Sequence, residues 1–152
     1  MHLEYKILKK FTQNGETLAL AESCTGGLIG NLLTNVPGAS AFLVLGIIAY
    51  DNTAKILLLG ISPSLLKKHG AVSAQVASAM AINVRKILKT DYGLGITGIA
   101  GPGGSSPQKP VGLVFIAISN KKKTKIKKLL FKGNRLAIKK QAAQTALKML
   151  AK

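Results

Sequence analysis

The segment from residue 17 to residue 34 most strongly constrains the fold, because an apolar run passes through a glycine turn into a helix-like run. Residues 17–22 predict a strand, and residues 25–34 predict a helix. The junction reads Ala21-Glu22-Ser23-Cys24-Thr25-Gly26-Gly27. A strand–turn–helix junction of this kind brings hydroxyl groups and free backbone N–H groups to a helix N-terminus, where negative charge is stabilised.

The rest of the chain alternates between helix-like and strand-like segments. Helices are expected over residues 1–13, 52–59, 73–88 and 134–150, with a further short helix beginning at Ser62-Pro63. Strands are expected over residues 41–50, 92–97, 111–119 and 125–131. The first of these is apolar throughout, which predicts burial on both faces, and the lysines of the last predict an edge strand. This order predicts a single α/β domain over residues 1–152, with three α/β/α layers and a mixed, mostly parallel sheet.

Positive charge is extreme and is concentrated in the C-terminal part of the chain. The net charge is +17, and residues 92–152 contain thirteen of the 22 Lys and Arg residues but none of the five acidic residues. The dense run Lys121–Lys128 fits either a surface for anions or nucleic acid, or a solvated hairpin turn. We favour the solvated turn, because no aromatic residues are interleaved for base stacking.

Composition also narrows the class of protein. With five acids, two histidines and one cysteine, and without metal-ligand spacing among them, the chain is not expected to hold a metal. The N-terminus lacks a long apolar segment, and no apolar run approaches 18 residues. We therefore expect a cytoplasmic protein that has no contact with a membrane.

Ser23 is the leading candidate for a nucleophile. The backbone N–H groups of Thr25, Gly26 and Gly27 at the start of the helix are candidate donors to developing negative charge. Two alternatives remain at this point. Ser23 or Thr25 serves only to cap the helix, or the neighbouring Cys24 is the nucleophile, although a buried cysteine is commonly inert.

Lys55 is the candidate base. If Asn52 is the N-cap of the helix over residues 52–59, Lys55 occupies the third helical position, where a cation opposes the helix dipole. That position favours the neutral amine, which can accept a proton from a serine hydroxyl. Tyr50, at the end of the preceding strand, is expected to orient Lys55 or line the pocket. The alternatives are an ordinary exposed lysine and a tyrosine that simply ends the strand.

A second glycine-rich loop follows the strand over residues 92–97. It begins Thr97-Gly98-Ile99-Ala100-Gly101 and supplies a hydroxyl and several backbone donors, although a merely flexible connection would have a similar composition. Arg135 opens the last helix and is placed to bind a phosphate, although an isolated arginine there is usually a surface residue. Two polar loops at strand ends commonly form one site in an α/β protein.

Together these motifs resemble the CinA C-terminal domain family, which includes stand-alone nicotinamide mononucleotide amidases of the PncC type. The matching segments are residues 21–27, Val36-Pro37-Gly38-Ala39-Ser40, Ala49-Tyr50-Asp51-Asn52-Thr53-Ala54-Lys55, His69-Gly70-Ala71-Val72-Ser73, residues 97–104 and Lys109-Pro110-Val111-Gly112. They cover nearly the whole chain in order.

The resemblance implies hydrolysis of the carboxamide of nicotinamide mononucleotide to nicotinate mononucleotide and ammonia, without a metal or other cofactor. It makes Ser23 the nucleophile and Lys55 its base, with Tyr50 and Thr97 assisting. It places the substrate against Thr25, Gly26, Gly27, Asn52, Gly98, Gly101 and Arg135, the last of these holding the phosphate. It also implies a homodimer.

The chain departs from the family pattern at two places. The family's closing signature Gly-Asp-Arg-x-x-Ile-Arg is here Gly133-Asn134-Arg135-Leu136-Ala137-Ile138-Lys139, and Tyr-Ser-Asn is here Tyr50-Asp51-Asn52. The loss of a carboxylate at Asn134 and of a guanidinium at Lys139 predicts weaker substrate binding or altered specificity. The competing hypothesis is a nucleotide- or nucleic-acid-binding module without catalytic activity. The basic C-terminal part of the chain suggests this hypothesis.

Overall fold

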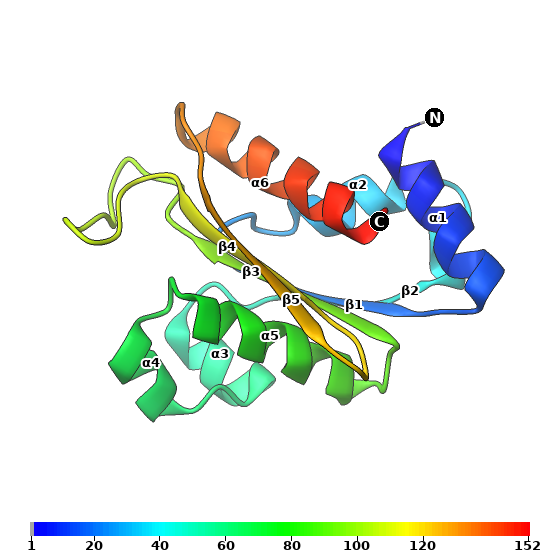
Figure 1. Cartoon of the computed structure of the whole chain (residues 1–152), viewed down its shortest axis with the longest axis horizontal. Helices are drawn as coiled ribbons and strands as arrows, with labels where there is room; N and C mark the ends of the chain where they lie inside the picture. The colour runs from blue at the N-terminus through cyan, green and yellow to red at the C-terminus, as the bar shows by residue number, and fades with distance from the viewer. Residues whose placement is uncertain (1) are drawn as a thin grey trace.

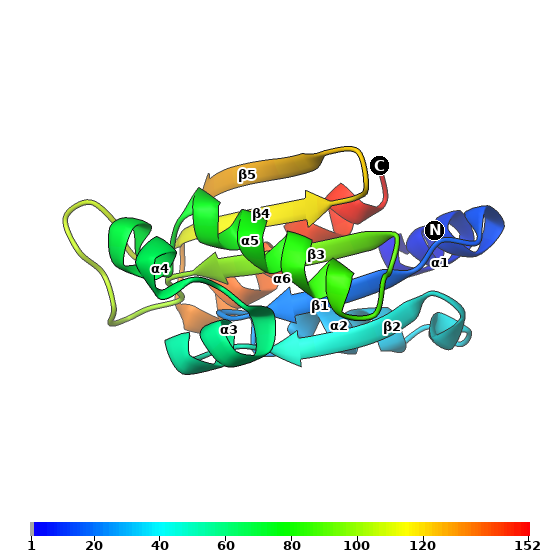
Figure 2. The same cartoon turned by 90° about the horizontal axis from the view of Figure 1, so that it is seen from below.

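A computed structural model describes residues 2–152, which form one five-stranded sheet between two layers of helices (Figures 1 and 2). The strand order is β2-β1-β3-β4-β5. The strands are β1 (Leu18–Glu22), β2 (Leu43–Ile48), β3 (Tyr92–Gly98), β4 (Leu113–Ser119) and β5 (Thr124–Leu130). Strands β2, β1 and β3 pair in parallel, while β4 pairs antiparallel with both β3 and β5. Only β4 therefore runs against the others, as predicted for a mixed, mostly parallel sheet.

Six α-helices cover the two faces of the sheet. One face carries α1 (Leu3–Asn14), α2 (Leu28–Thr34) and α6 (Arg135–Leu150), and the other carries α3 (Asn52–Leu59), α4 (Pro63–His69) and α5 (Ala74–Ile87) (Figure 1). A 3₁₀ turn over Ala39–Ala41 leads into β2. The predicted α/β/α layering is confirmed. No helix in residues 2–152 combines the length and apolarity needed to span a membrane.

Helix α5 packs very closely on β3, because β3 presents glycines to it. Gly93 and Gly95 lie two residues apart and so face the same side of the sheet. A Cβ added at Gly93 would overlap the carbonyl oxygen of Ala81, and one at Gly95 would overlap that of Ala77. The close approach sets a short distance between α5 and the sheet, so α5 packs tightly against β3.

The prediction that residues 41–50 are buried on both faces is wrong. Strand β2 begins only at Leu43 and forms an edge of the sheet, so alternate residues remain exposed. Val44 is 45% exposed and Ile48 is 54% exposed. An apolar run usually indicates burial, but here apolar side chains at the edge are left uncovered within this chain.

Two predicted helix starts are also corrected. Helix α2 begins at Leu28, because residues 25–27 form a turn in which Gly26 and Gly27 both adopt positive φ. The N-cap of α3 is Asp51 rather than Asn52, and its carboxylate accepts a hydrogen bond of 2.7 Å from the N–H of Thr53. Lys55 is therefore the fourth residue of the helix and not the third.

The carboxyl ends of β1, β2 and β3 meet at one edge of the sheet, since these three strands are parallel. The glycine turn follows β1, the segment leading to α3 follows β2, and the long loop over residues 99–112 follows β3 and projects from this edge (Figure 2). Parallel α/β sheets usually bind ligands at this edge.

Candidate active site

Ser23 is held rigidly at the carboxyl end of β1. Its N–H donates a hydrogen bond of 3.1 Å to the carbonyl of Ile96 in β3, so the residue continues the sheet pairing by one position. Its Oγ lies 3.0 Å from the Nζ of Lys55, which comes from α3. The sequence predicts these two residues as nucleophile and base, and the fold brings them into hydrogen-bond contact although they lie 32 positions apart in the chain.

The Nζ of Lys55 is buried and lies within hydrogen-bond distance of three oxygen atoms. The side chain is 1% exposed, and its Nζ also lies 2.9 Å from the carbonyl oxygen of Ala49 and 3.1 Å from that of Tyr50. A neutral amine has two N–H bonds and one lone pair. In its neutral form, Lys55 would donate these two N–H groups to the two carbonyls and accept a hydrogen bond from the hydroxyl of Ser23 with its lone pair, whereas the ammonium donates to all three oxygens. The neutral form has the arrangement that a general base for a serine requires.

The pKa of Lys55 is lowered from its ordinary value chiefly because burial disfavours the ammonium form. The carboxylate of Asp51 acts in the opposite direction but is outweighed. The direction agrees with the sequence-based expectation, although the physical cause is burial.

Glu22 was missed as a site residue, although it organises the glycine turn. Its side chain is 3% exposed and accepts four hydrogen bonds. The donors are the hydroxyl of Thr25 at 2.5 Å and the backbone N–H groups of Gly27 at 3.1 Å, Ile29 at 3.2 Å and Gly30 at 2.9 Å. The carboxylate thus caps α2 in place of Ser23 or Thr25 and complements the helix dipole. The available signal was that Glu22 is the only charged residue between positions 17 and 50.

Only part of the predicted set of backbone donors is free. The N–H of Gly26 donates to the carbonyl of Ser23, and that of Gly27 donates to Glu22. Neither is therefore available to a substrate. Within residues 2–152, the N–H groups of Cys24 and Thr25 make no hydrogen bond to another residue. These two amides directly follow Ser23 in the chain and are candidate donors to an oxyanion formed there.

Cys24 is not suited to act as the nucleophile. Its side chain is buried in the core formed with α2 and α6. Burial raises the pKa of the thiol to about 12. The reactive thiolate is therefore essentially unpopulated at neutral pH, which favours Ser23 of the two adjacent residues.

Arg135 connects two of the loops at this edge of the sheet. Its guanidinium donates 2.7 Å hydrogen bonds to the carbonyl of Gly101 and to the hydroxyl of Tyr50. These contacts leave further guanidinium N–H groups for an anion. One turn later on α6, the Nζ of Lys139 lies 3.7 Å from where a Cβ on Gly26 would be. Lys139 therefore lies beside the glycine turn, while Arg135, one turn earlier on the same helix, contacts the loops of Tyr50 and Gly101.

Asn134, the altered residue in the closing signature, caps a helix, and this role does not require a carboxylate. The side chain of Asn134 accepts a 2.9 Å hydrogen bond from the N–H of Ala137 and so caps α6. Arg135 is oriented instead by Tyr50 and Gly101. The guanidinium is therefore held in place without a carboxylate at position 134.

The remaining predicted residues have mainly structural contacts. The hydroxyl of Thr97 is buried and donates to the carbonyl of Ala71 at 2.9 Å. A Cβ at Gly98 would press on β4, so this glycine permits strand packing. Asn52 is exposed in the first turn of α3. Tyr50 contributes to the Lys55 site through its backbone carbonyl, while its exposed ring reaches Arg135. Among residues 2–152, no group of three or more His, Cys, Asp and Glu side chains is placed to hold a metal.

Comparison with known proteins finds the same domain over the whole chain. Residues 1–152 match the model of the CinA C-terminal domain. A CinA-like protein of Acidobacterium capsulatum is 47% identical over 148 residues, and one of Anaeromyxobacter is 48% identical over 144 residues. These alignments cover 97% and 95% of this chain but only 36% and 35% of the relatives. The chain thus spans about a third of the length of the curated relatives it matches.

Solved structures with similar folds are nearly the same length as this chain. The competence/damage inducible protein CihA of Agrobacterium tumefaciens is 39% identical with a TM-score of 0.95, and the match covers 97% of this chain and 91% of that one. A competence-damaged protein (CinA) superfamily protein of Enterobacter cloacae is 32% identical with a TM-score of 0.94, and the match covers 98% and 88%.

Proposed function

The chain belongs to the CinA C-terminal domain family, and we propose that it is a metal-independent amidohydrolase that converts nicotinamide mononucleotide to nicotinate mononucleotide and ammonia. The observation that carries the proposal is the 3.0 Å contact between the hydroxyl of Ser23 and the buried, carbonyl-bound amine of Lys55. Ammonia release from nicotinamide mononucleotide by the purified protein tests this function directly.

The first half of the reaction transfers the acyl group to Ser23. Neutral Lys55 removes the hydroxyl proton, and the Oγ forms a bond to the carboxamide carbon. Negative charge develops on the amide oxygen, for which the N–H groups of Cys24 and Thr25 are the nearest unused donors along the chain. The ammonium of Lys55 then protonates the nitrogen, the carbon–nitrogen bond breaks, and ammonia leaves behind an ester of Ser23.

The second half hydrolyses that ester. Lys55, neutral again, takes a proton from water while the water oxygen bonds to the acyl carbon. The bond from this carbon to the Oγ of Ser23 breaks, and Lys55 returns the proton to the Oγ. Nicotinate mononucleotide is released, and the dyad regains its starting protonation state.

Arg135 and Lys139 are proposed to bind the substrate phosphate. Both project from the first turns of α6 toward loops beside the dyad, where they would neutralise a phosphate's charge. With Arg135→Ala, we expect KM for nicotinamide mononucleotide to rise by roughly 10- to 100-fold, the range of a charge-assisted hydrogen bond. Steady-state kinetics with nicotinamide riboside, which lacks the phosphate, should show no comparable change.

The matched control for Arg135→Ala is Lys140→Ala, which removes a cation from an exposed position of the same helix. This variant should keep the KM of the wild type within about twofold, the range of an exposed charge. An equal loss on the mononucleotide and the riboside would contradict a phosphate-binding role for Arg135.

We also propose that two copies of the chain associate through β2. Residues 23–50 contain no charged side chain, although each copy carries a net charge of +17. The opposite sheet edge, β5, carries Lys125, Lys127 and Lys128, which discourage strand pairing, whereas β2 exposes Val44 and Ile48. An uncharged apolar edge is the part of the surface on which two such cationic copies repel each other least.

Light scattering should therefore show a dimer for the wild type and a monomer for Val44→Lys, because a lysine there places like charges across the pairing. Leu88→Lys adds the same charge at an exposed position of similar apolar character and should remain dimeric. A monomeric wild type, or a Val44→Lys variant that stays dimeric, would contradict pairing through β2.

A further inference from the structure

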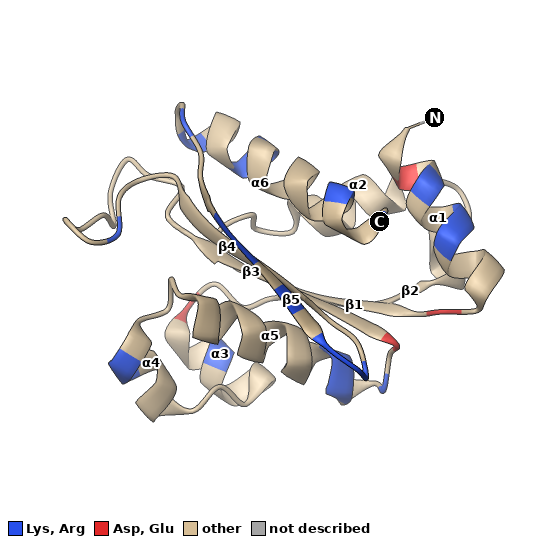
Figure 3. Cartoon of the chain, viewed as in Figure 1, with Lys and Arg blue, Asp and Glu red and all other residues tan. Residues whose placement is uncertain are grey.

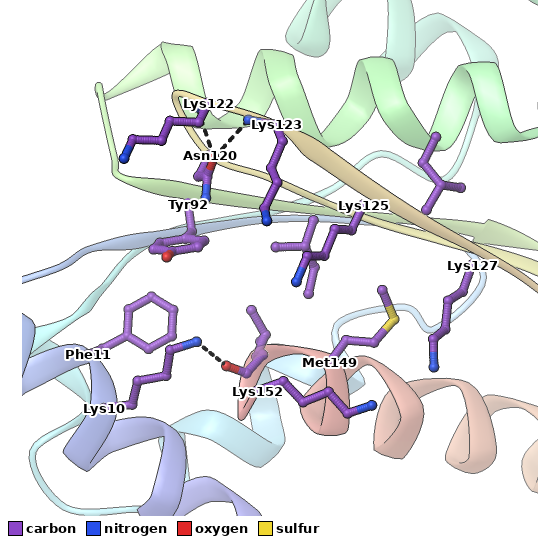
Figure 4. Close-up of a pocket in the computed structure, with 13 residues that line it drawn as sticks. Lys10, Phe11, Tyr92, Asn120, Lys122, Lys123, Lys125, Lys127, Met149 and Lys152 are labelled. Atoms are coloured by element: carbon purple, nitrogen blue, oxygen red, sulfur yellow. Dashed lines mark hydrogen bonds between the residues drawn. The ribbon is translucent and has the colours of Figure 1, made fainter.

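A large groove lies at the opposite end of the strands from the candidate active site. It has a volume of about 730 Å³ and is formed by α1, the start of β3, the β4–β5 hairpin and the end of α6 (Figure 4). Tyr92 is the first residue of β3 and Asn120 directly follows β4, so both lie at the edge away from Ser23. The groove is therefore a feature separate from the Ser23–Lys55 dyad.

Lysines from three separate segments converge on this groove. Its lining includes Lys10 from α1, Lys152 from the C-terminus, and four lysines of the hairpin: Lys122, Lys123, Lys125 and Lys127. Figure 4 shows the side chains of Lys123, Lys125 and Lys127 extending from β5 and its turn toward the helices, with Lys10 of α1 and Lys152, just beyond α6, on the facing side. No acidic residue is among the lining residues in the described part of the chain.

The arrangement differs from a uniformly solvated hairpin. Lys121 and Lys128 belong to the same hairpin but do not line the groove, whereas Lys123, Lys125 and Lys127 alternate onto one face. Figure 3 shows further Lys and Arg positions along β5, α1 and α6, which border the same side of the molecule. A neighbouring hollow of about 300 Å³ shares Lys127 and Lys152 and adds Lys6 and Lys148.

Six lysines line the groove, and the carboxylate of Glu16 acts on one of them, Lys10. Lys10 donates a 2.9 Å hydrogen bond to the carbonyl of Leu150 and lies 5.6 Å from the ring centroids of both Phe11 and Tyr92. Burial lowers the pKa of Lys10, the charge of Glu16 opposes this effect in part, and the charge of Lys125 adds a smaller lowering. A bound anion would relieve this repulsion among neighbouring ammonium groups.

The rest of the lining is apolar and suits the body of a small molecule. Tyr92, Ile118 and Met149 form this part of the surface. A volume of about 730 Å³ lies within the range of small-molecule sites, about 300–1,000 Å³. Lys10 lies against both aromatic rings, so the rings are not free platforms for the successive bases of a nucleic acid strand.

We propose that this groove is a second binding site, which takes a small molecule carrying two or more linked phosphates. The phosphates would lie among the ammonium groups of Lys10, Lys123, Lys125 and Lys127, and an attached apolar or ring-containing group would lie against Ile118 and Met149. The phosphates have two possible sources, a nucleoside polyphosphate and inorganic polyphosphate, which share the chemistry that the groove recognises.

Isothermal titration calorimetry of the full chain tests the proposal, with ATP and tripolyphosphate as separate probes. The titrations use about 0.15 M salt without magnesium, so that diffuse surface attraction is screened. We expect binding by the wild type and at least tenfold weaker binding by the double variant Lys125→Gln/Lys127→Gln. The matched double variant Lys121→Gln/Lys128→Gln loses the same charge from the same hairpin and should bind within twofold of the wild type.

The titrations distinguish the two sources of phosphate and can overturn the proposal. Tighter binding of ATP than of tripolyphosphate identifies a nucleoside polyphosphate, and equal binding identifies inorganic polyphosphate. Absence of binding, or equal weakening in the two double variants, would overturn the proposal. So would groove-dependent binding of a single-stranded oligothymidine at least tenfold tighter than that of either probe. Thermal unfolding of each variant verifies that the fold is retained.

Discussion

Replacing Lys55 with methionine is expected to lower kcat/KM for nicotinamide mononucleotide by about 10³-fold, within the range attributed to general-base catalysis. Methionine has a similar length and no proton-accepting nitrogen, so the hydroxyl of Ser23 would keep its position but lose its base. Lys55→Arg should be similarly inactive, because a guanidinium donates to the two carbonyls but remains protonated.

The pH dependence of the wild type should report the same group. Lys55 acts as a base only when neutral, and burial lowers its pKa below that of an exposed lysine. As the pH falls through this lowered pKa, Nζ becomes protonated and kcat/KM should fall with it. As the pH rises through it, activity should increase to a plateau. Initial rates across a series of buffers measure this profile.

Circular dichroism and thermal unfolding of the Lys55 variants serve as controls for the fold. A Lys55→Met protein that is folded and retains more than a tenth of wild-type kcat/KM would exclude Lys55 as the base. A wild-type kcat/KM that does not fall as the pH is lowered would lead to the same conclusion.

Glu22→Ala is expected to reduce the free energy of unfolding by about 3–5 kcal/mol, measured by urea denaturation. The change leaves four donors without their acceptor, and a buried unsatisfied group commonly costs about 1–3 kcal/mol. The four costs are not additive, because water would enter and the turn would relax. Such a loss is a large fraction of the stability of an ordinary domain.

Glu22→Gln should have an intermediate effect, because its amide retains one acceptor oxygen while its NH₂ group faces backbone donors. Glu16→Gln serves as the charge-matched control, since the carboxylate of Glu16 accepts a hydrogen bond from the exposed side chain of Asn14 and caps no helix. A loss of less than about 1 kcal/mol, a typical effect of a surface substitution or a single hydrogen bond, in Glu22→Ala would show that the carboxylate does not hold the turn.

The fold was largely predictable because its strands and helices carry strong local signals. The sequence predicts helices that begin at Ser62 and Ser73, and in the structure both residues are N-caps, since each side chain accepts a hydrogen bond from the third following N–H. The edge position of β2 was not predictable, because an apolar run looks the same whether it is covered by neighbouring strands or left exposed.

The dyad was predictable from residue types, but its environment was not. Placing Lys55 near Ser23 needed only the parallel order of β1 and β2, whereas its lowered pKa depends on burial that no local pattern reveals. The role of Glu22 was hidden for the same reason, since three of its four donors are backbone N–H groups, up to eight residues away. Asp51 and Asn52 were both reasonable caps, and only the observed bond to Thr53 distinguishes them.

The most direct test of the central claim is incubation of the purified protein with nicotinamide mononucleotide, followed by quantification of ammonia and nicotinate mononucleotide. Ser23→Ala and Cys24→Ala are measured in parallel as adjacent, similarly small changes. The account predicts equal amounts of both products from the wild type, activity close to wild type from Cys24→Ala, and none above background from Ser23→Ala. Deamidation by a folded Ser23→Ala protein, or no deamidation by the folded wild type, would contradict it.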